Sequence, residues 1–186
     1  MFAVKTVLYD YSDMITRYGS AYQIDLAVKS GELFKIARGL YSDTHHVSDN
    51  AVVCALYPPA VLTMDSAFYL YNLTDVVPLK VHVATPRNST RIHLKQVKQY
   101  FMEQRLANAG VVQQESGGTL IRVFSKERML VELLRKSATL PLDYYKEFIA
   151  SYRKIVNTLD MQEVENCIAL YRNADRLFEK LQMEVL

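Results

Sequence analysis

The stretch GELFKIARGLYSD, residues 31–43, decides how the front of this chain folds. Its first residue, Gly31, can adopt the left-handed conformation that ends a helix. Apolar residues then lie on both sides of the pair Arg38 and Gly39, a pattern that predicts a short strand, a tight turn and a second short strand. Because so small a hairpin is not stable alone in water, we expect it to pack against the segments that precede it.

A helix-turn-helix pattern lies directly before the hairpin. Ser20 and Gln23 have the S-x-x-Q spacing of a capping box, so we expect a helix over residues 20–30. Apolar residues, Ala21 among them, recur on one face of that helix, and a turn separates it from a short helix at about residues 12–17. The order helix, turn, helix and hairpin is that of a winged-helix domain, in which the second helix enters the major groove of DNA and the hairpin, or wing, touches the backbone.

Six polar residues of this segment are then candidates for contacts with DNA. They project from the second helix or from the wing: Ser20, Tyr22, Gln23, Lys29, Lys35 and Arg38. The alternative is a small packing module with an incidental hairpin. Charge favours this alternative, because residues 1–50 hold five Lys/Arg and six Asp/Glu, and a net charge of −1 is poor for binding DNA.

The polar stretch at residues 42–50 is the best domain boundary in the chain. We expect an α+β protein, with a small winged-helix domain at residues 1–45 and a larger mixed α/β domain at residues 46–186 that is helical from about residue 141. Within the larger domain, residues 91–155 hold twelve basic and six acidic side chains, a net charge of +6. Such a segment suits either an acidic partner or an ordinary solvated surface.

Periodicity places several elements in the larger domain. A hairpin is predicted around the ESGG turn at residues 115–118, and Ser125 is expected to cap the helix that follows. A helix over residues 65–72 is expected to turn Ala67, Leu70 and Tyr71 inward. Residues 94–106 fit either a helix or a strand.

No catalytic pattern is visible in the sequence. His45 and His46 are adjacent rather than spaced as metal ligands, and no cluster of Cys, His or acidic residues accompanies them, so we predict no metal site and no cofactor. Cys54 and Cys167 are expected to be buried free thiols of a reducing cytoplasm. Residues 1–13 lack the features of a secretion signal, and no apolar run is long enough to span a bilayer. We therefore expect a cytoplasmic protein that is not an enzyme.

Four stretches in the same order resemble the AbiEi family, the antitoxins of type IV toxin–antitoxin (abortive infection) systems. LFKIARGLYS at residues 33–42 resembles that family's wing, and VLTMDSAFYLYNLTDVVPLKVHVATP at residues 61–86 its strand, helix and strand. IRVFSKERMLVELLRK at residues 121–136 is similar to its S-x-E-R-x-L-x-x-L-L-R signature, and the final helices, ending in LQMEVL at residues 181–186, also resemble the family.

The resemblance implies a transcriptional repressor and antitoxin. The winged-helix domain would bind inverted repeats in its own promoter, and the larger domain would counteract a nucleotidyltransferase-type toxin, with or without a stable complex. It implies that residues 94–106 contain a strand, that Ser66 and Leu70 match the central helix, and that Arg128 of the signature makes a structural ion pair. The basic surface that would face the toxin or nucleic acid is expected on one side of the central sheet: Arg91, Lys95, Lys98 and Arg105.

A second interpretation retains the antitoxin function without DNA binding. In that case the protein is a non-catalytic interaction module that counteracts a toxin without binding a promoter. Removal of residues 1–45 would then leave neutralisation of the toxin intact, whereas the repressor interpretation requires those residues for regulation of the operon.

Overall fold

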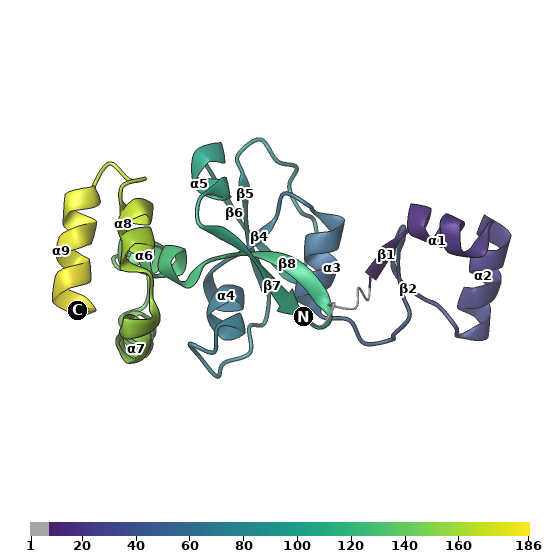
Figure 1. Ribbon diagram of the computed structural model, residues 1–186, viewed down its shortest axis with the longest axis horizontal. Coiled ribbons are helices and arrows are strands. Elements are labelled where there is room, and N and C mark those ends of the chain that lie inside the picture. The colour runs from purple at the N-terminus through teal and green to yellow at the C-terminus, as the bar shows by residue number, and fades with distance from the viewer. Residues whose placement is uncertain (1–7) are drawn as a thin grey trace. The chain divides into compact units, whose positions relative to one another are not determined.

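The computed structural model describes residues 8–186 (Figure 1). They divide into two compact units, each of which we describe by itself. The first unit extends to Ala60 and also includes Gln113–Ile121, whereas the second comprises Val61–Val112 and Arg122–Leu186. The expected lack of a secretion signal rests partly on residues 1–7, which lie outside the described part, and the expected boundary between functional domains stays a prediction.

The first unit combines helices with a three-stranded sheet. In chain order it contains β1 (Leu8–Asp10), α1 (Tyr11–Tyr18), α2 (Ala21–Ser30), β2 (Phe34–Ala37), β3 (Leu40–Ser42) and α3 (Asp49–Leu56). The strands are antiparallel in the order β1-β3-β2. Tyr41 of the central strand β3 pairs with Tyr9 of β1 on one side and with Lys35 of β2 on the other. The predicted succession of helix, turn, helix and hairpin is confirmed as a set of elements (Figure 1). Strand β1 was not predicted from the sequence.

Local hydrogen bonds explain where α1 and α2 begin and end. Asp10 and Asp13 form a reciprocal capping box at the start of α1. At the start of α2, Ser20 Oγ accepts a hydrogen bond from the backbone N–H of Gln23 at 3.3 Å. Gly31 ends α2 with a φ of 79°, a left-handed conformation that favours glycine. These ends lie close to the positions that the sequence predicts.

The small core of the first unit ties the hairpin to both helices. Its buried members come from α1, α2 and the hairpin strands with their flanks: Met14, Ile24, Ala27, Leu33 and Tyr41. Arg17 Nη1 of α1 lies 2.7 Å from Asp43 Oδ1 just after β3, and Tyr9 also donates to Asp43 at 3.0 Å. Ala21 was expected on the apolar face but is exposed, because it opens α2 and the core lies under the later turns.

The second sheet has five strands in the order β6-β5-β4-β8-β7. They are β4 (Val61–Leu62), β5 (Val81–Pro86), β6 (Val97–Met102), β7 (Val111–Ser116) and β8 (Thr119–Phe124). β4 runs antiparallel to β5 and parallel to β8, and β5 runs parallel to β6, so the sheet is mixed. Every residue of β5 is buried, as expected for an inner strand, whereas β6 lies at an edge. The ambiguous segment thus contains a strand.

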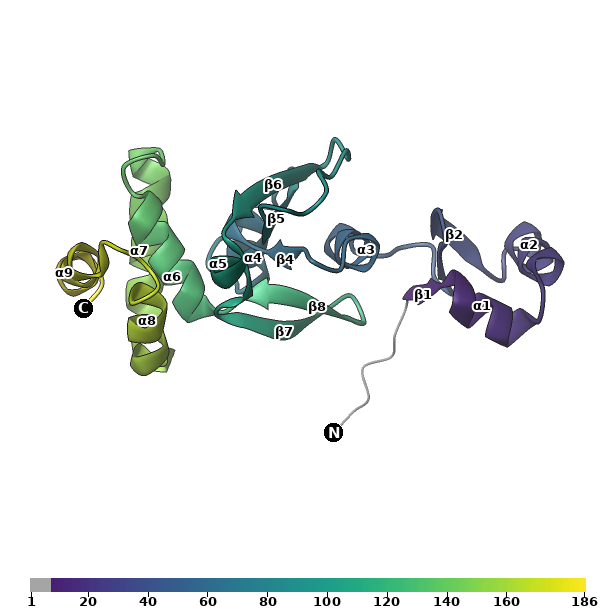
Figure 2. The same cartoon turned by 90° about the horizontal axis from the view of Figure 1, so that it is seen from above.

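Helices make up most of the second unit. They are α4 (Met64–Leu70), α5 (Gln104–Asn108), α6 (Lys126–Lys136), α7 (Leu142–Ile155), a 3-10 turn (Val156–Thr158), α8 (Met161–Ile168) and α9 (Ala174–Glu184). α6 is in contact with α7, α8 and α9 (Figure 2). Phe68 of α4 stacks on Phe148 of α7 with ring centroids 4.1 Å apart. No helix in the described residues is long and apolar enough to cross a membrane.

The structure therefore confirms a mixed α+β protein with two sheets and corrects two details. In α4 the inward side chains include Phe68, while Leu70 and Tyr71 are only partly buried, because the helix begins one residue earlier than expected and its last turn reaches the surface. Cys167 is a buried free thiol as predicted, but Cys54 is only partly buried.

Candidate functional site

The candidate DNA-binding residues occupy exposed positions of the first unit. Tyr22 is 73% exposed, and Gln23 and Lys29 are also exposed on α2. Lys35 on β2 and Arg38 in the turn are exposed as well. Ser20 differs, because its hydroxyl accepts the capping hydrogen bond of α2. The structure thus leaves five of the six side chains available on α2 and on the hairpin.

The cations of this surface are not neutralised within the described structure. The ion pair of the first unit joins Arg17 to Asp43, and it does not involve Lys29, Lys35 or Arg38. Glu32, which lies at the end of α2, accepts a hydrogen bond from Tyr18 at 3.0 Å. The surface therefore combines three free cations with an exposed aromatic ring and an amide, which are the side-chain types that contact phosphates and base edges.

The hairpin turn has a fixed conformation. Gly39 adopts a φ of 74°, and an added Cβ would meet nothing within 4 Å, so the conformation rather than the space favours glycine here. The register shifts between Lys35 and Ala37, which marks an irregularity in β2 just before the turn. Arg38 therefore lies between the irregularity in β2 and the left-handed Gly39, which together set the backbone conformation of the turn.

The four residues of the expected basic surface come from three segments of the second unit. Arg91 and Lys95 are exposed in the segment between β5 and β6, and Lys98 is on β6. Arg105 on α5 donates to the carbonyl of Leu170 at 2.8 Å, so its guanidinium is already engaged. Lys98 Nζ instead lies 5.4 Å from the centre of the Tyr100 ring.

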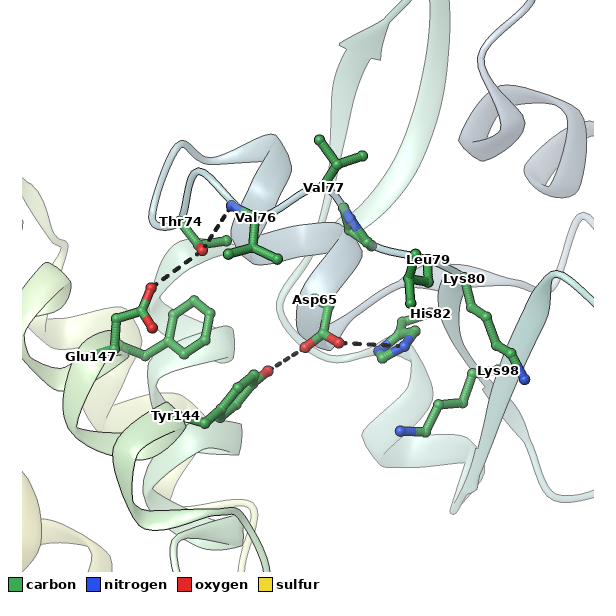
Figure 3. Close-up of a pocket in the computed structure, with 12 residues that line it drawn as sticks. Asp65, Thr74, Val76, Val77, Leu79, Lys80, His82, Lys98, Tyr144 and Glu147 are labelled. Carbon is green, nitrogen blue, oxygen red and sulfur yellow. Dashed lines mark hydrogen bonds and ion pairs between the residues drawn. The ribbon is translucent and has the colours of Figure 1, made fainter.

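A pocket of about 580 Å³ in the second unit brings together residues that the sequence analysis did not associate (Figure 3). Asp65 of α4 lies at its centre. It accepts a hydrogen bond from the hydroxyl of Tyr144 and lies 3.5 Å from Nε2 of His82 (Figure 3). His82 Nδ1 is in turn 3.4 Å from the hydroxyl of Tyr100. Polar groups from α7, α4 and β5 therefore meet in the pocket, and Tyr100 of β6, outside its lining, extends this chain of contacts.

Burial controls protonation in this chain of groups. It lowers the pKa of His82, and the positive charges of Lys98 and Lys80 lower it further, while Asp65 acts in the opposite direction. Burial and the hydrogen bond to Asp65 raise the pKa of Tyr144 well above its ordinary value. Both rings are therefore neutral at pH 7, and the phenol serves as a donor rather than as an anion.

The rim of the pocket is apolar and exposed. Val76 and Val77 are 68% and 64% exposed, and Leu79 is 99% exposed. On the opposite wall Glu147 accepts a hydrogen bond from Thr74 at 3.4 Å (Figure 3). The arrangement offers an apolar contact surface above a polar floor. The ring nitrogens of His82 lie 3.4 Å from the Tyr100 hydroxyl and 3.5 Å from Asp65, which are long contacts.

The sequence concealed this pocket because its members come from distant segments. Asp65 and His82 are seventeen positions apart, and Tyr144 follows much later. His82 stands alone in the sequence, and only the run at residues 61–86, which carries the family resemblance, contains both it and Asp65. Among residues 8–186, no group of three or more His, Cys, Asp or Glu side chains is placed to hold a metal ion.

Comparison with known proteins gives a likeness in fold. No protein-family model matches the chain. No curated protein matches it either. Among solved structures it is similar to the crystal structure of the RV2827C protein from Mycobacterium tuberculosis, with a TM-score of 0.64 and 14% sequence identity, over 95% of this chain and 72% of that one. At that identity the likeness concerns the fold alone.

Proposed function

We propose that this protein is a DNA-binding repressor that also serves as the antitoxin of a type IV toxin–antitoxin system. The observation that carries the first half is the exposed surface made by α2 and the β2–β3 hairpin. On it, Tyr22 and Gln23 are available to base edges, and the three cations have no partner within the described structure. The second half comes from the ordered resemblance to the AbiEi antitoxins.

The arrangement of the first unit supports the proposal. A helix-turn-helix whose second helix is exposed along one face, followed directly by a hairpin, is the layout of winged-helix proteins. In that layout α2 enters the major groove, where the amide of Gln23 can pair with adenine. Lys35 and Arg38 then reach phosphates beside the groove and hold the helix in register.

The proposal makes the two kinds of contact separable by mutation. Arg38→Ala removes a phosphate contact and weakens binding by a similar factor on every DNA sequence. Gln23→Ala removes a base contact. It therefore reduces the difference in binding free energy between the promoter repeat and unrelated DNA, by about 1–3 kcal/mol per bidentate pair. Lys95→Ala is the matched control, because Lys95 is an equally exposed cation in the second unit.

A gel-shift titration on the native promoter tests the repressor half. We expect binding that weakens with salt, a uniform loss for Arg38→Ala, a loss of specificity for Gln23→Ala and no change for Lys95→Ala. Absence of any salt-sensitive shift with the wild-type protein would refute DNA binding.

Co-expression with the product of an adjacent nucleotidyltransferase-like gene tests the antitoxin half. We expect the full chain to restore growth, and Arg38→Ala to restore it as well while losing repression. Rescue by residues 46–186 alone would assign neutralisation to the larger domain. Failure of the full chain to rescue growth would refute the antitoxin assignment and leave the repressor half standing.

A further inference from the structure

A second cavity of the second unit, of about 380 Å³, has three basic and two acidic residues in its lining. It lies beside the edge strand β6 and against α6, and its walls include Arg87, Arg135, Lys136, Tyr100, Phe101 and Tyr171. Arg135 and Lys136 close the signature helix α6, a motif that the proposed function does not use. The question is why this helix ends on two adjacent cations inside a cavity.

The nearest carboxylate is already shared between two arginines. Glu132 is 1% exposed, and its oxygens lie 2.7 Å from Arg128 Nη2 and 2.7 Å from Arg135 Nη2. The hydroxyl of Tyr171 also donates to it. The expected structural ion pair of Arg128 is thereby confirmed. Glu132 therefore has no capacity left for a third cation, and Lys136 adds a charge that this network does not balance.

Lys136 is a cation of the cavity lining that makes no ion pair with the other described residues. It is partly buried, its Nζ lies 5.0 Å from the centre of the Tyr100 ring, and no carboxylate lies within 4.0 Å of it in the described structure. Burial lowers the pKa of Lys136 and the charge of Arg135 lowers it further, while the charge of Glu132 acts in the opposite direction without cancelling them. An ammonium held in this way is less stable than in water, and an anion bound beside it would offset that cost.

The surroundings carry an excess of positive charge. Arg128 is fully buried, and its Nε and Nη1 have no hydrogen-bond partner among the described residues, so its charge is only partly compensated by Glu132. Lys98 Nζ also lies over the Tyr100 ring, 5.4 Å from its centre, and adds to the positive potential. Glu103 is the remaining acid of the cavity lining, and it is exposed to water, which screens its charge.

We propose that this cavity binds a phosphate-bearing ligand of nucleotide size, with its phosphate against Lys136 and Arg87. Arg135 donates to Glu132 through Nε and Nη2, so it contributes its charge and its remaining Nη1. Arginine and lysine together are the side chains that proteins use for phosphate groups. Tyr100 lines the cavity, and its ring lies 5.0 Å from Lys136 Nζ, so an aromatic surface borders the phosphate position. The volume falls within the range of small-ligand pockets.

The same chemistry occurs in a free nucleotide and at the phosphorylated end of a nucleic-acid strand. Isothermal titration calorimetry of the full chain with inorganic phosphate, AMP and a trinucleotide with or without a 5′-phosphate separates these sources. We expect AMP to bind more tightly than phosphate, because its nucleoside can fill the part of the cavity that phosphate leaves empty. A trinucleotide that binds more tightly than AMP, and only when phosphorylated, identifies a strand end; otherwise the ligand is a free nucleotide.

Matched variants identify the site. Lys136→Met should weaken AMP binding at least tenfold, and Arg87→Gln about fivefold, whereas Lys146→Met on the exposed face of α7 should leave it within twofold. Absence of binding by every probe, or wild-type affinity in both Lys136→Met and Arg87→Gln, would overturn the proposal. Arg87 is exposed, so its variant folds even if Lys136→Met does not.

Discussion

Removing the charge of Glu132 is the sharpest test of what holds the second unit together. Its carboxylate is buried between Arg128 and Arg135, and Glu132→Gln leaves two guanidinium groups without a counter-charge. Breaking a buried pair by removing one partner costs about 3–5 kcal/mol. Because the amide oxygen of Gln still accepts one hydrogen bond, we expect the low end, about 3 kcal/mol, in the free energy of unfolding.

Thermal and urea unfolding measure this loss. For a chain of this length, 1 kcal/mol corresponds to about 2–4 °C, so Glu132→Gln should lower the midpoint of the second unit by about 6–12 °C. Glu179→Gln is the control, since Glu179 is exposed on α9 and the substitution removes the same charge. We expect it to change the free energy of unfolding by no more than about 0.5 kcal/mol. A loss below about 1 kcal/mol for Glu132→Gln would show that the arginines find other partners and would refute the reasoning.

The pH dependence gives an independent readout of the same group. Burial alone would raise the pKa of Glu132, but the charges of Arg128 and Arg135 and the hydrogen bond from Tyr171 hold it below its ordinary value. A carboxyl with a lowered pKa stabilises the fold above its unfolded pKa of about 4.3 and loses that contribution as the pH falls through the lower, folded value. Wild-type stability should therefore fall in that window, and the loss should be smaller in Glu132→Gln.

Three further substitutions test packing, backbone and protonation. Phe68→Ala, which removes the fully buried ring stacked on Phe148, should cost about 3–5 kcal/mol in urea unfolding. Gly31→Ala should cost about 1–2 kcal/mol in the first unit, because its φ of 79° suits glycine. His82 should titrate below pH 6.5 by NMR, and since the unfolded state then binds its proton more readily, stability should fall below pH 6.5 in the wild type and not in His82→Gln.

The first unit could be predicted well because its signals are local. Ser20 and Gln23, three positions apart, mark the start of α2, and Gly31 marks its end. Arg38 and Gly39 then make the turn of the hairpin. Each of these features acts within a few residues along the chain, so spacing alone identifies it. β1 was missed because a three-residue strand has too little pattern of its own and forms through pairing with β3.

The pockets of the second unit could not be predicted, because each is assembled from separate elements. Asp65, His82 and Tyr144 lie on α4, β5 and α7, and their proximity depends on the order of strands in a mixed sheet. Periodicity finds which face of a helix is buried but not what it meets. Lys136 could not be predicted as part of a cavity for the same reason. In the sequence it is simply a cation at the end of α6, where it complements the helix dipole. Only the fold shows that no carboxylate of the described residues pairs with it.

The scarcity of basic residues in the first unit constrains how it can repress a promoter. If Lys29, Lys35 and Arg38 each neutralise one phosphate, a single copy gives a log-log salt slope of about −2.7, and affinity falls about 40-fold between 50 and 200 mM salt. Two copies on an inverted repeat give a slope of about −5.4 and a loss of about 10³-fold over the same range. The slope measured on the native promoter thus reports how many copies engage. A slope near −2.7 that is unchanged on half of the repeat would rule out paired binding, and a slope that halves when one repeat is destroyed would establish it.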